Sequence, residues 1–150
     1  MGLLDKAKLN TIGQGLLGNL SQQGVTDLEK EYSKYIFEGE KIMSGFKLIR
    51  DALIFTNLRV IFFDKQGATG QKMSVKSIYL SNIVDVEMET SGFGFDDSEL
   101  TIYFLTNIRT KAHGENLDSH KFEFPKKFDV SQLYRMLGEI VLANRARINE

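Results

Sequence analysis

The chain contains no cysteine and no tryptophan, and it has only one proline in 150 residues. The lack of cysteine excludes disulfide bonds, thiol catalysis and thiolate metal sites. No purely apolar run is longer than four residues, as in Val60–Phe63, whereas a membrane-spanning helix needs about 20 residues. No apolar block of signal-peptide length follows the first lysines. We therefore expect a cytoplasmic protein without a membrane span.

The chain also lacks an excess of either charge. Lysine and arginine total 19, aspartate and glutamate total 20, and the formal net charge is −1. A nucleic-acid-binding protein usually carries a basic excess or a basic stripe, so we expect no nucleic acid among the partners. Apolar residues make up 42% and charged residues 26% of the chain, which is typical of a globular domain.

Residues 1–24 differ in composition from the rest of the chain. They are rich in glycine, leucine, asparagine and glutamine, and they contain no aromatic residue. Several leucines can share one helical face, but each glycine costs such a helix up to about 1 kcal/mol relative to alanine. We interpret this segment as an amphipathic helix or a flexible arm. It could pack on its own domain, bind a partner or lie on a membrane surface. Residues 25–150 are then the folded domain.

The pattern of apolar residues predicts a short helix followed by seven strands. Helical spacing of Val25, Leu28, Tyr32 and Tyr35 indicates a helix over 25–35. From there the period changes to two, as in half-buried strands. The expected strands span 42–47, 50–56, 59–64, 72–80, 83–89, 99–106 and 120–124. Asn57 is predicted to form a tight turn between the second and third strands because it tolerates a left-handed conformation.

A second helix is predicted after the last strand. Asp129 is a good N-cap residue, and an apolar stripe follows it at helical spacing. Asn144 is the only residue that interrupts this stripe. Seven antiparallel strands and one apolar-faced helix predict a mainly β fold with α: a small barrel or sandwich capped by its C-terminal helix.

Four short stretches resemble one known family. These are Phe46–Asp51, Leu53–Ile61, Asp64–Gly67 and Glu89–Gly92, and together they resemble the bacterial pleckstrin-homology (PH) domain family. The resemblance implies a PH-like seven-stranded antiparallel barrel or sandwich with a C-terminal capping helix. It also implies assembly into cyclic rings and no established enzymatic activity.

Self-association is the function that the sequence favours. Apolar residues occupy both faces of the 53–63 hairpin; one face would fill the barrel, and the other needs a cover. The C-terminal capping helix, residues 1–35 of the same chain or a second subunit could supply that cover. Phe93 and Phe95 lie between glycines after a strand and either fold back on the core or contact a neighbouring subunit. We therefore expect a homo-oligomer, and a ring if a head-to-tail contact closes.

The alternative function is binding to an anionic lipid headgroup, or to another protein, at the inner face of the membrane. The site would lie at the opening between strands 1–2 and 3–4. Converging basic side chains bind phosphate, and the candidates are Lys47, Arg50, Lys65 and Lys72. Asp51 and Asp64 are interleaved with them and would neutralise part of their field.

Catalytic and metal sites are not predicted. The only two histidines, His113 and His120, lie close together in a polar segment with Glu115 and Asp118, which we interpret as a solvated loop. Triad chemistry needs a nucleophile and a base in one pocket, and the sequence offers no such pair. We expect no catalytic residue, no cofactor and no metal.

Overall fold

The computed structural model describes residues 22–47, 51–66, 72–92, 97–125 and 129–150, without the side chains of 22–25 and Lys47. These residues form two compact units that meet in the sequence between Tyr79 and Leu80. No helix of the described residues is long and apolar enough to cross a membrane.

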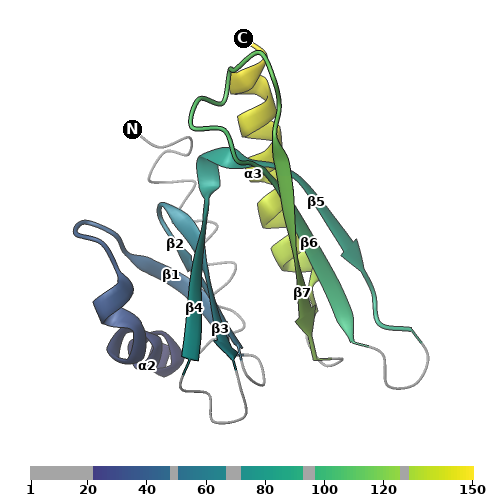
Figure 1. Cartoon of the computed structure of the whole chain (residues 1–150). Coiled ribbons are helices and arrows are strands. Elements are labelled where there is room, and N and C mark those ends of the chain that lie inside the picture. The colour runs from purple at the N-terminus through teal and green to yellow at the C-terminus, as the bar shows by residue number, and fades with distance from the viewer. Residues whose placement is uncertain (1–21, 48–50, 67–71, 93–96, 126–128) are drawn as a thin grey trace. The chain divides into compact units, whose positions relative to one another are not determined.

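The first unit is a helix and a four-stranded antiparallel sheet (Figure 1). Its strands lie in the order β1-β2-β3-β4, so that β1 and β4 are the edges. The elements are α2 (Gln22–Tyr32), the 3-10 helix η1 (Ser33–Tyr35), β1 (Ile42–Lys47), β2 (Asp51–Thr56), β3 (Arg59–Gln66) and β4 (Lys72–Tyr79).

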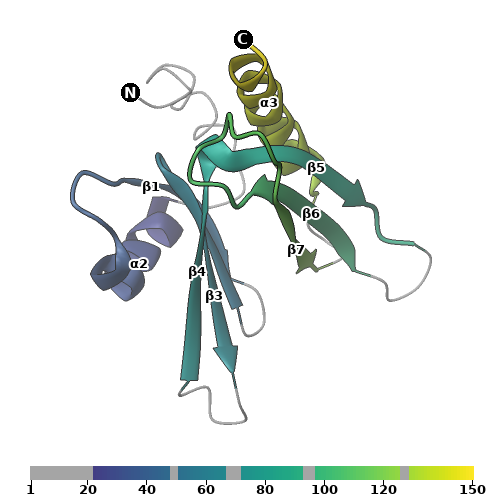
Figure 2. The same cartoon turned by 45° about the horizontal axis from the view of Figure 1, so that its top comes forward.

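Both faces of the β2–β3 hairpin are buried. One face carries Ala52, Ile54, Ile61 and Phe63, and the other carries Leu53, Phe55, Val60 and Phe62. Leu28 and Tyr32 of α2 pack on the first of these faces, with the rings of Tyr32 and Phe63 4.3 Å apart. Figures 1 and 2 both show α2 beside this sheet. Of the covers that the sequence left open for this face, the structure shows the helix within residues 1–35.

The boundaries of the first helix differ from the prediction. It begins at Gln22 rather than residue 25, and its α-helical part ends at Tyr32. Residues 33–35 continue it as a 3-10 turn, which keeps the ring of Tyr35 on Phe63 at a centroid distance of 5.4 Å. The expected division between residues 24 and 25 therefore falls inside a helix.

The tight hairpin at Thr56–Arg59 is confirmed, but the reason given for Asn57 is wrong. Among the described residues, the only positive φ belongs to Gly39, so Asn57 is not left-handed. Instead, its Oδ1 accepts a hydrogen bond from the Lys41 N–H at 2.8 Å, and its own N–H donates to the Lys41 carbonyl at 3.1 Å. Asn57 therefore ties the hairpin to the start of β1.

The second unit is a three-stranded antiparallel sheet with one long helix. Its elements are the 3-10 helix η2 (Leu80–Asn82), β5 (Ile83–Glu89), β6 (Ser98–Leu105), β7 (Leu117–Phe124) and α3 (Ser131–Ile148). The strand β7 begins three residues before its predicted start. The Thr106 N–H donates to the Asn116 carbonyl at 2.8 Å, and this bond continues the ladder past the pair Leu105 and Leu117.

The helix α3 lies along this sheet and contacts β5 (Figure 2). Most of its predicted apolar stripe is buried, but Tyr134, which the pattern also placed on that face, is exposed and Ile148 is half-buried. Val130 occupies the N-cap position, and the Asp129 carboxylate before it accepts the Ser131 N–H at 3.0 Å. Asn144, which interrupts the stripe, is fully buried. Its Nδ2 donates to the carbonyls of Leu80 and Ile83, both at 2.7 Å. Asn144 therefore binds the start of β5 to the helix.

Candidate functional site

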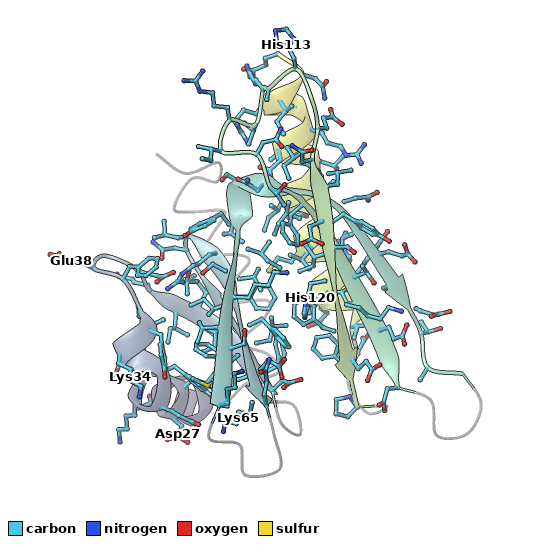
Figure 3. The ribbon with its side chains drawn as sticks, in the orientation of Figure 1. Asp27, Lys34, Glu38, Lys65, His113 and His120 are labelled. Carbon is cyan, nitrogen blue, oxygen red and sulfur yellow. The ribbon has the colours of Figure 1, made fainter. Side chains whose placement is uncertain are left out.

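The four basic residues predicted to bind an anion fall at one end of the four-stranded sheet, as far as the structure describes them. Lys47 is the last residue of β1, Lys65 lies near the end of β3, and Lys72 begins β4. In antiparallel order these positions share the end at which β1–β2 and β3–β4 connect. Arg50 lies outside the described residues. Lys65 and Lys72 are both exposed, and Figure 3 labels Lys65.

Strand alternation separates the two described lysine side chains. Lys65 pairs with Met73 and follows Phe63 by two residues, so it lies on the face that α2 covers. Lys72 pairs with Gln66 in the next register position and therefore belongs to the opposite face. The two side chains do not converge from one face on a common point, although such convergence would favour the binding of a phosphate.

Phe93 and Phe95, the predicted oligomer contacts, lie outside the described residues. The histidine segment is described throughout. His113, Glu115 and Asp118 are exposed, and His120 is half-buried with its ring 4.6 Å from that of Phe122. Figure 3 shows His113 on the β6–β7 connection and His120 on β7. Within the described parts of the chain, no group of three metal-ligating side chains is found.

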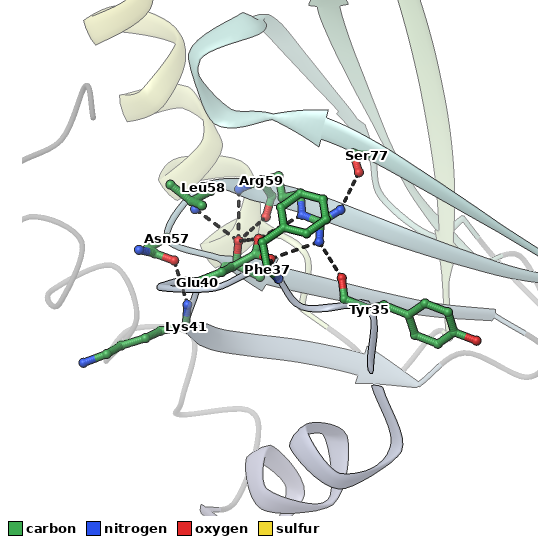
Figure 4. Close-up of polar contacts among 9 residues, drawn as sticks. Tyr35, Phe37, Glu40, Lys41, Asn57, Leu58, Arg59 and Ser77 are labelled. Carbon is green, nitrogen blue, oxygen red and sulfur yellow. Dashed lines mark hydrogen bonds and ion pairs between the residues drawn. The ribbon is translucent and has the colours of Figure 1, made fainter. Parts of the chain in front are cut away.

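A buried ion pair that the sequence analysis did not find occupies the other end of the first unit (Figure 4). Arg59 begins β3, and Glu40 lies just before β1; both are buried. The guanidinium binds the carboxylate with two hydrogen bonds, Nε to Oε2 at 2.8 Å and Nη2 to Oε1 at 2.9 Å. This two-point geometry is the strongest form of an arginine–carboxylate contact.

Further hydrogen bonds satisfy both partners. The Thr56 hydroxyl donates to Glu40 Oε2 at 2.6 Å, and the Phe37 N–H donates to Oε1 at 2.9 Å. On the other side, Arg59 donates from Nη1 to Ser77 Oγ at 2.6 Å and from Nη2 to the Tyr35 carbonyl at 2.7 Å. The pair therefore joins η1, the segment before β1, the β2–β3 hairpin and β4.

These contacts favour the ionised form of Glu40. Burial by itself raises the pKa of the carboxyl group, but the hydrogen bonds from Arg59, Thr56 and the Phe37 N–H together bring that pKa below its ordinary value. The carboxylate stays ionised and both its oxygens accept hydrogen bonds. It is therefore an anchor for the surrounding segments and not a group poised to give or take a proton.

One signal for this ion pair was present in the sequence. Arg59, Ile61 and Phe63 occupy every second position of one strand, so period-two alternation places Arg59 on a buried face. A buried arginine needs a carboxylate partner. Nothing local identifies Glu40 as that partner, because it lies 19 residues away in a segment without regular structure.

Three exposed apolar side chains lie over the ion pair or along the edge strand beside it, and we call them the apolar strip. The strip consists of Phe37, Val75 and Tyr79, whose side chains are 52%, 40% and 49% exposed. The Phe37 ring stacks on the guanidinium of Arg59, with its centroid 3.7 Å from Cζ (Figure 4). Tyr79 is the direct cross-strand neighbour of Arg59, and Val75 lies on the same face of the edge strand β4. The buried ion pair therefore supports an apolar surface along a sheet edge.

A cavity of about 470 Å³ lies beside η1, next to the start of β1. It is lined by Glu29, Ser33, Ile36, Glu40, Lys41 and Ile42. The lining mixes one exposed acid, one exposed base and two isoleucines, and the carboxylate of Glu40 is already bound to Arg59. This arrangement favours no particular charge on a ligand.

The comparisons with known proteins agree with one another on the family. The sequence model of the family described as "Bacterial PH domain" matches residues 11–141. Among curated proteins, the chain is 34% identical over 128 residues to the uncharacterized protein YjqA of Bacillus subtilis strain 168, covering 85% of this chain and 96% of that protein. It is 30% identical over 121 residues to YozO of the same organism, covering 81% and 95%.

Two solved structures are similar in fold. A pleckstrin-homology domain from Shewanella amazonensis SB2B aligns with a TM-score of 0.61 at 29% identity, covering 85% of this chain and 96% of that one. A protein of the DUF1696 family with a pleckstrin-homology domain, from Shewanella loihica PV-4, gives a TM-score of 0.57 at 29% identity, covering 78% and 92%. The predicted PH-like fold, with four and three antiparallel strands and a C-terminal helix, is confirmed.

Proposed function

The chain belongs to the bacterial PH domain family, and we propose that it is a non-enzymatic module that assembles with further copies of itself. The observation that carries this proposal is the apolar strip Phe37, Val75 and Tyr79. Aromatic and apolar side chains exposed together mark interaction surfaces. This strip also borders β4, which is an edge strand of the four-stranded sheet in the part of the chain that the structure describes, and edge strands are templates for pairing with another chain.

The bonding of the buried charged residues supports a non-enzymatic role. Glu40 and Arg59, the buried charged residues in the described part of the first unit, bind each other and their neighbours. Their hydrogen bonds rigidify the base of the strip. A rigid apolar surface is suited to docking a protein, because less side-chain entropy is lost when it is covered.

The symmetry of the assembly depends on what the strip meets. The sheet has two different edges, β4 with the strip and β1 on the opposite side. A contact between the strip and a different surface of the next copy is heterologous, and such contacts give a ring when the rotation closes. We therefore extend the proposal to a closed ring of identical subunits.

The test is the absolute mass in solution, measured by light scattering after size-exclusion chromatography across a range of concentrations. We expect a discrete multiple of the 17.0 kDa protomer. The double variant Phe37→Ser with Tyr79→Lys should have a lower mass. Leu117→Ser is the matched control, because Leu117 is equally exposed, at 58%, but lies in the second unit. A monomer at every concentration would contradict the proposal.

Binding of an anionic headgroup is the second candidate. The observation in its favour is that exposed Lys65 and Lys72 share one end of the sheet. Their placement on opposite faces weakens this candidate, as does the acidic residue Asp64, which belongs to the same face of the sheet as Lys72. We rank it below self-assembly for these reasons.

A further inference from the structure

One atom of the buried Asn144 side chain has no hydrogen-bond partner. The residue is fully buried in the second unit, and its Nδ2 donates to the carbonyls of Leu80 and Ile83, both at 2.7 Å. These two acceptors settle which end of the amide is the nitrogen. The other end, Oδ1, is also buried and accepts no hydrogen bond from any described residue. A buried acceptor without a donor costs stability, so this atom needs an explanation.

A second buried atom without a partner lies nearby on the same helix. Arg147 follows Asn144 by three residues, and residues three apart are neighbours on a helix surface. Its Nη2 donates to the Ser81 carbonyl at 2.9 Å, and its Nη1 donates to the Thr110 hydroxyl at 3.1 Å. The Nε–H of the same guanidinium is buried and has no acceptor among the described residues. The helix therefore presents one unmatched acceptor and one unmatched donor.

Both side chains reach the same short segment. Asn144 binds the carbonyl of Leu80 and Arg147 binds that of Ser81, which are consecutive residues of η2. The two polar ends are therefore held against one 3-10 turn, although Nε and Oδ1 form no direct hydrogen bond. A molecule that accepts from Nε–H and donates to Oδ1 bridges two such atoms at a separation of about 4.6 Å.

We propose that one internal water molecule binds here, accepting a hydrogen bond from Arg147 Nε–H and donating one to Asn144 Oδ1. The two atoms select this ligand. The amide oxygen repels an anion and the guanidinium repels a cation, so the ligand is a small neutral molecule that both donates and accepts. Buried water makes about three hydrogen bonds. The Ser81 carbonyl can accept the third, because its oxygen has two lone pairs and Arg147 Nη2 uses one.

The water site lies where the chain enters the second unit. Asn144 and Arg147 together bind three carbonyls of the segment 80–83. This segment directly follows Tyr79, the last residue of β4 and a member of the apolar strip. The water joins the two side chains that hold the segment and satisfies the atoms that they leave unpaired. The inference concerns the second unit alone and does not depend on self-assembly.

NMR contacts between water and protein protons test the site in the full-length chain. A long-lived internal water gives NOESY and ROESY cross-peaks of opposite sign to a nearby N–H, whereas proton exchange gives the same sign in both. We expect cross-peaks of opposite sign at the Nε–H of Arg147. The matched control is Arg109, which is exposed and should show none. The lack of such a cross-peak at Arg147 would overturn the inference.

Two variants separate the water from other proton sources, with folding checked by the amide spectrum. Thr110→Val removes the hydroxyl beside Arg147 and should leave the water cross-peak unchanged. Asn144→Leu removes the acceptor and should abolish it. Loss of the cross-peak in Thr110→Val, or its persistence in folded Asn144→Leu, would contradict the assignment.

A measurement on the native chain covers the case in which Asn144→Leu does not fold. A coupling across a hydrogen bond from Arg147 Nε to Asn144 Cγ would show that the two side chains bind each other directly. We expect no such coupling, and its detection would overturn the inference.

Discussion

Arg59 and Glu40 are joined by two parallel hydrogen bonds of 2.8 and 2.9 Å inside the first unit. The pair lies beneath an exposed phenylalanine ring and beside an exposed tyrosine. A buried charge without its partner is costly. The surface above the pair therefore depends on both partners being present, which links the stability of this unit to the shape of its interaction strip.

Removing one partner of the pair should destabilise the protein strongly. We expect Arg59→Met to lower the free energy of unfolding by about 3–5 kcal/mol, because it leaves the Glu40 carboxylate buried and unpaired. The measurement is urea denaturation followed by circular dichroism. Arg109→Met, at an exposed position, is the control and should change stability by less than about 0.5 kcal/mol.

The double variant Glu40→Leu with Arg59→Met sharpens this test. Replacing both charges by apolar groups removes the unpaired charge that each single variant leaves behind. The double variant should therefore cost less than the sum of the two single variants. Additive costs would show that the two residues contribute independently, contrary to the geometry.

The same pair makes stability depend on pH. The pKa of Glu40 is lower in the folded protein than its ordinary value of 4.5. A carboxyl group of this kind stabilises the fold above its unfolded pKa, and the contribution is lost as the pH falls through the folded pKa. We expect the difference in unfolding free energy between the native chain and Glu40→Gln to be constant near neutral pH and to shrink below about pH 4. A difference that does not change down to pH 2 would contradict this.

The strands were predictable from the sequence because their apolar residues alternate along each strand. In β6, for example, Leu100, Ile102 and Phe104 are buried and the residues between them are half-buried. The ends of the strands were less predictable. The start of β7 depends on a bond between Thr106 and Asn116, ten residues apart, which no local pattern indicates.

The site was harder to predict than the fold. Arg59 and Asn144 were visible as polar residues at positions of apolar stripes, but their partners are 19 and more than 60 residues away. Such long-range pairs follow from the tertiary packing. Lys65 and Lys72 lie at one end of the sheet, but the expectation that they converge did not take into account that their register positions belong to opposite faces.

Asn144 should contribute to the stability of the second unit. Replacing it by leucine removes the donor for two buried carbonyls, those of Leu80 and Ile83. Each carbonyl left without a hydrogen bond costs about 1–3 kcal/mol. The control is Asn149→Leu, because Asn149 is exposed and its Nδ2 donates only to the Arg145 carbonyl of its own helix. Equal losses of stability in the two variants, measured by urea denaturation, would contradict the assigned role.

Gly45 allows the close packing of α2 on β1. A Cβ atom at this position would lie 2.5 Å from Leu28 Cδ1 and 3.1 Å from the Leu53 carbonyl oxygen. We expect Gly45→Ala to cost about 1–3 kcal/mol by overpacking. Gly114→Ala is the control, since nothing lies within 4 Å of its Cβ position. Because Leu28 is the nearest obstacle, adding Leu28→Val should cost less in the Gly45→Ala chain than in the native one.

The two lysines at the sheet end provide the test between the proposed functions. Since Lys65 and Lys72 belong to opposite faces, we expect no shared phosphate site. Sedimentation with phosphatidylglycerol–phosphatidylcholine vesicles should then be weak, and physiological salt should abolish it by screening. The control is Lys111→Glu, at an exposed position in the second unit. It changes the net charge as much as Lys65→Glu or Lys72→Glu does, so all three variants should reduce the sedimentation equally. Strong sedimentation at physiological salt that only Lys65→Glu and Lys72→Glu remove would instead establish a headgroup site. In that case the sheet end, and not the strip above Arg59, would be the functional surface.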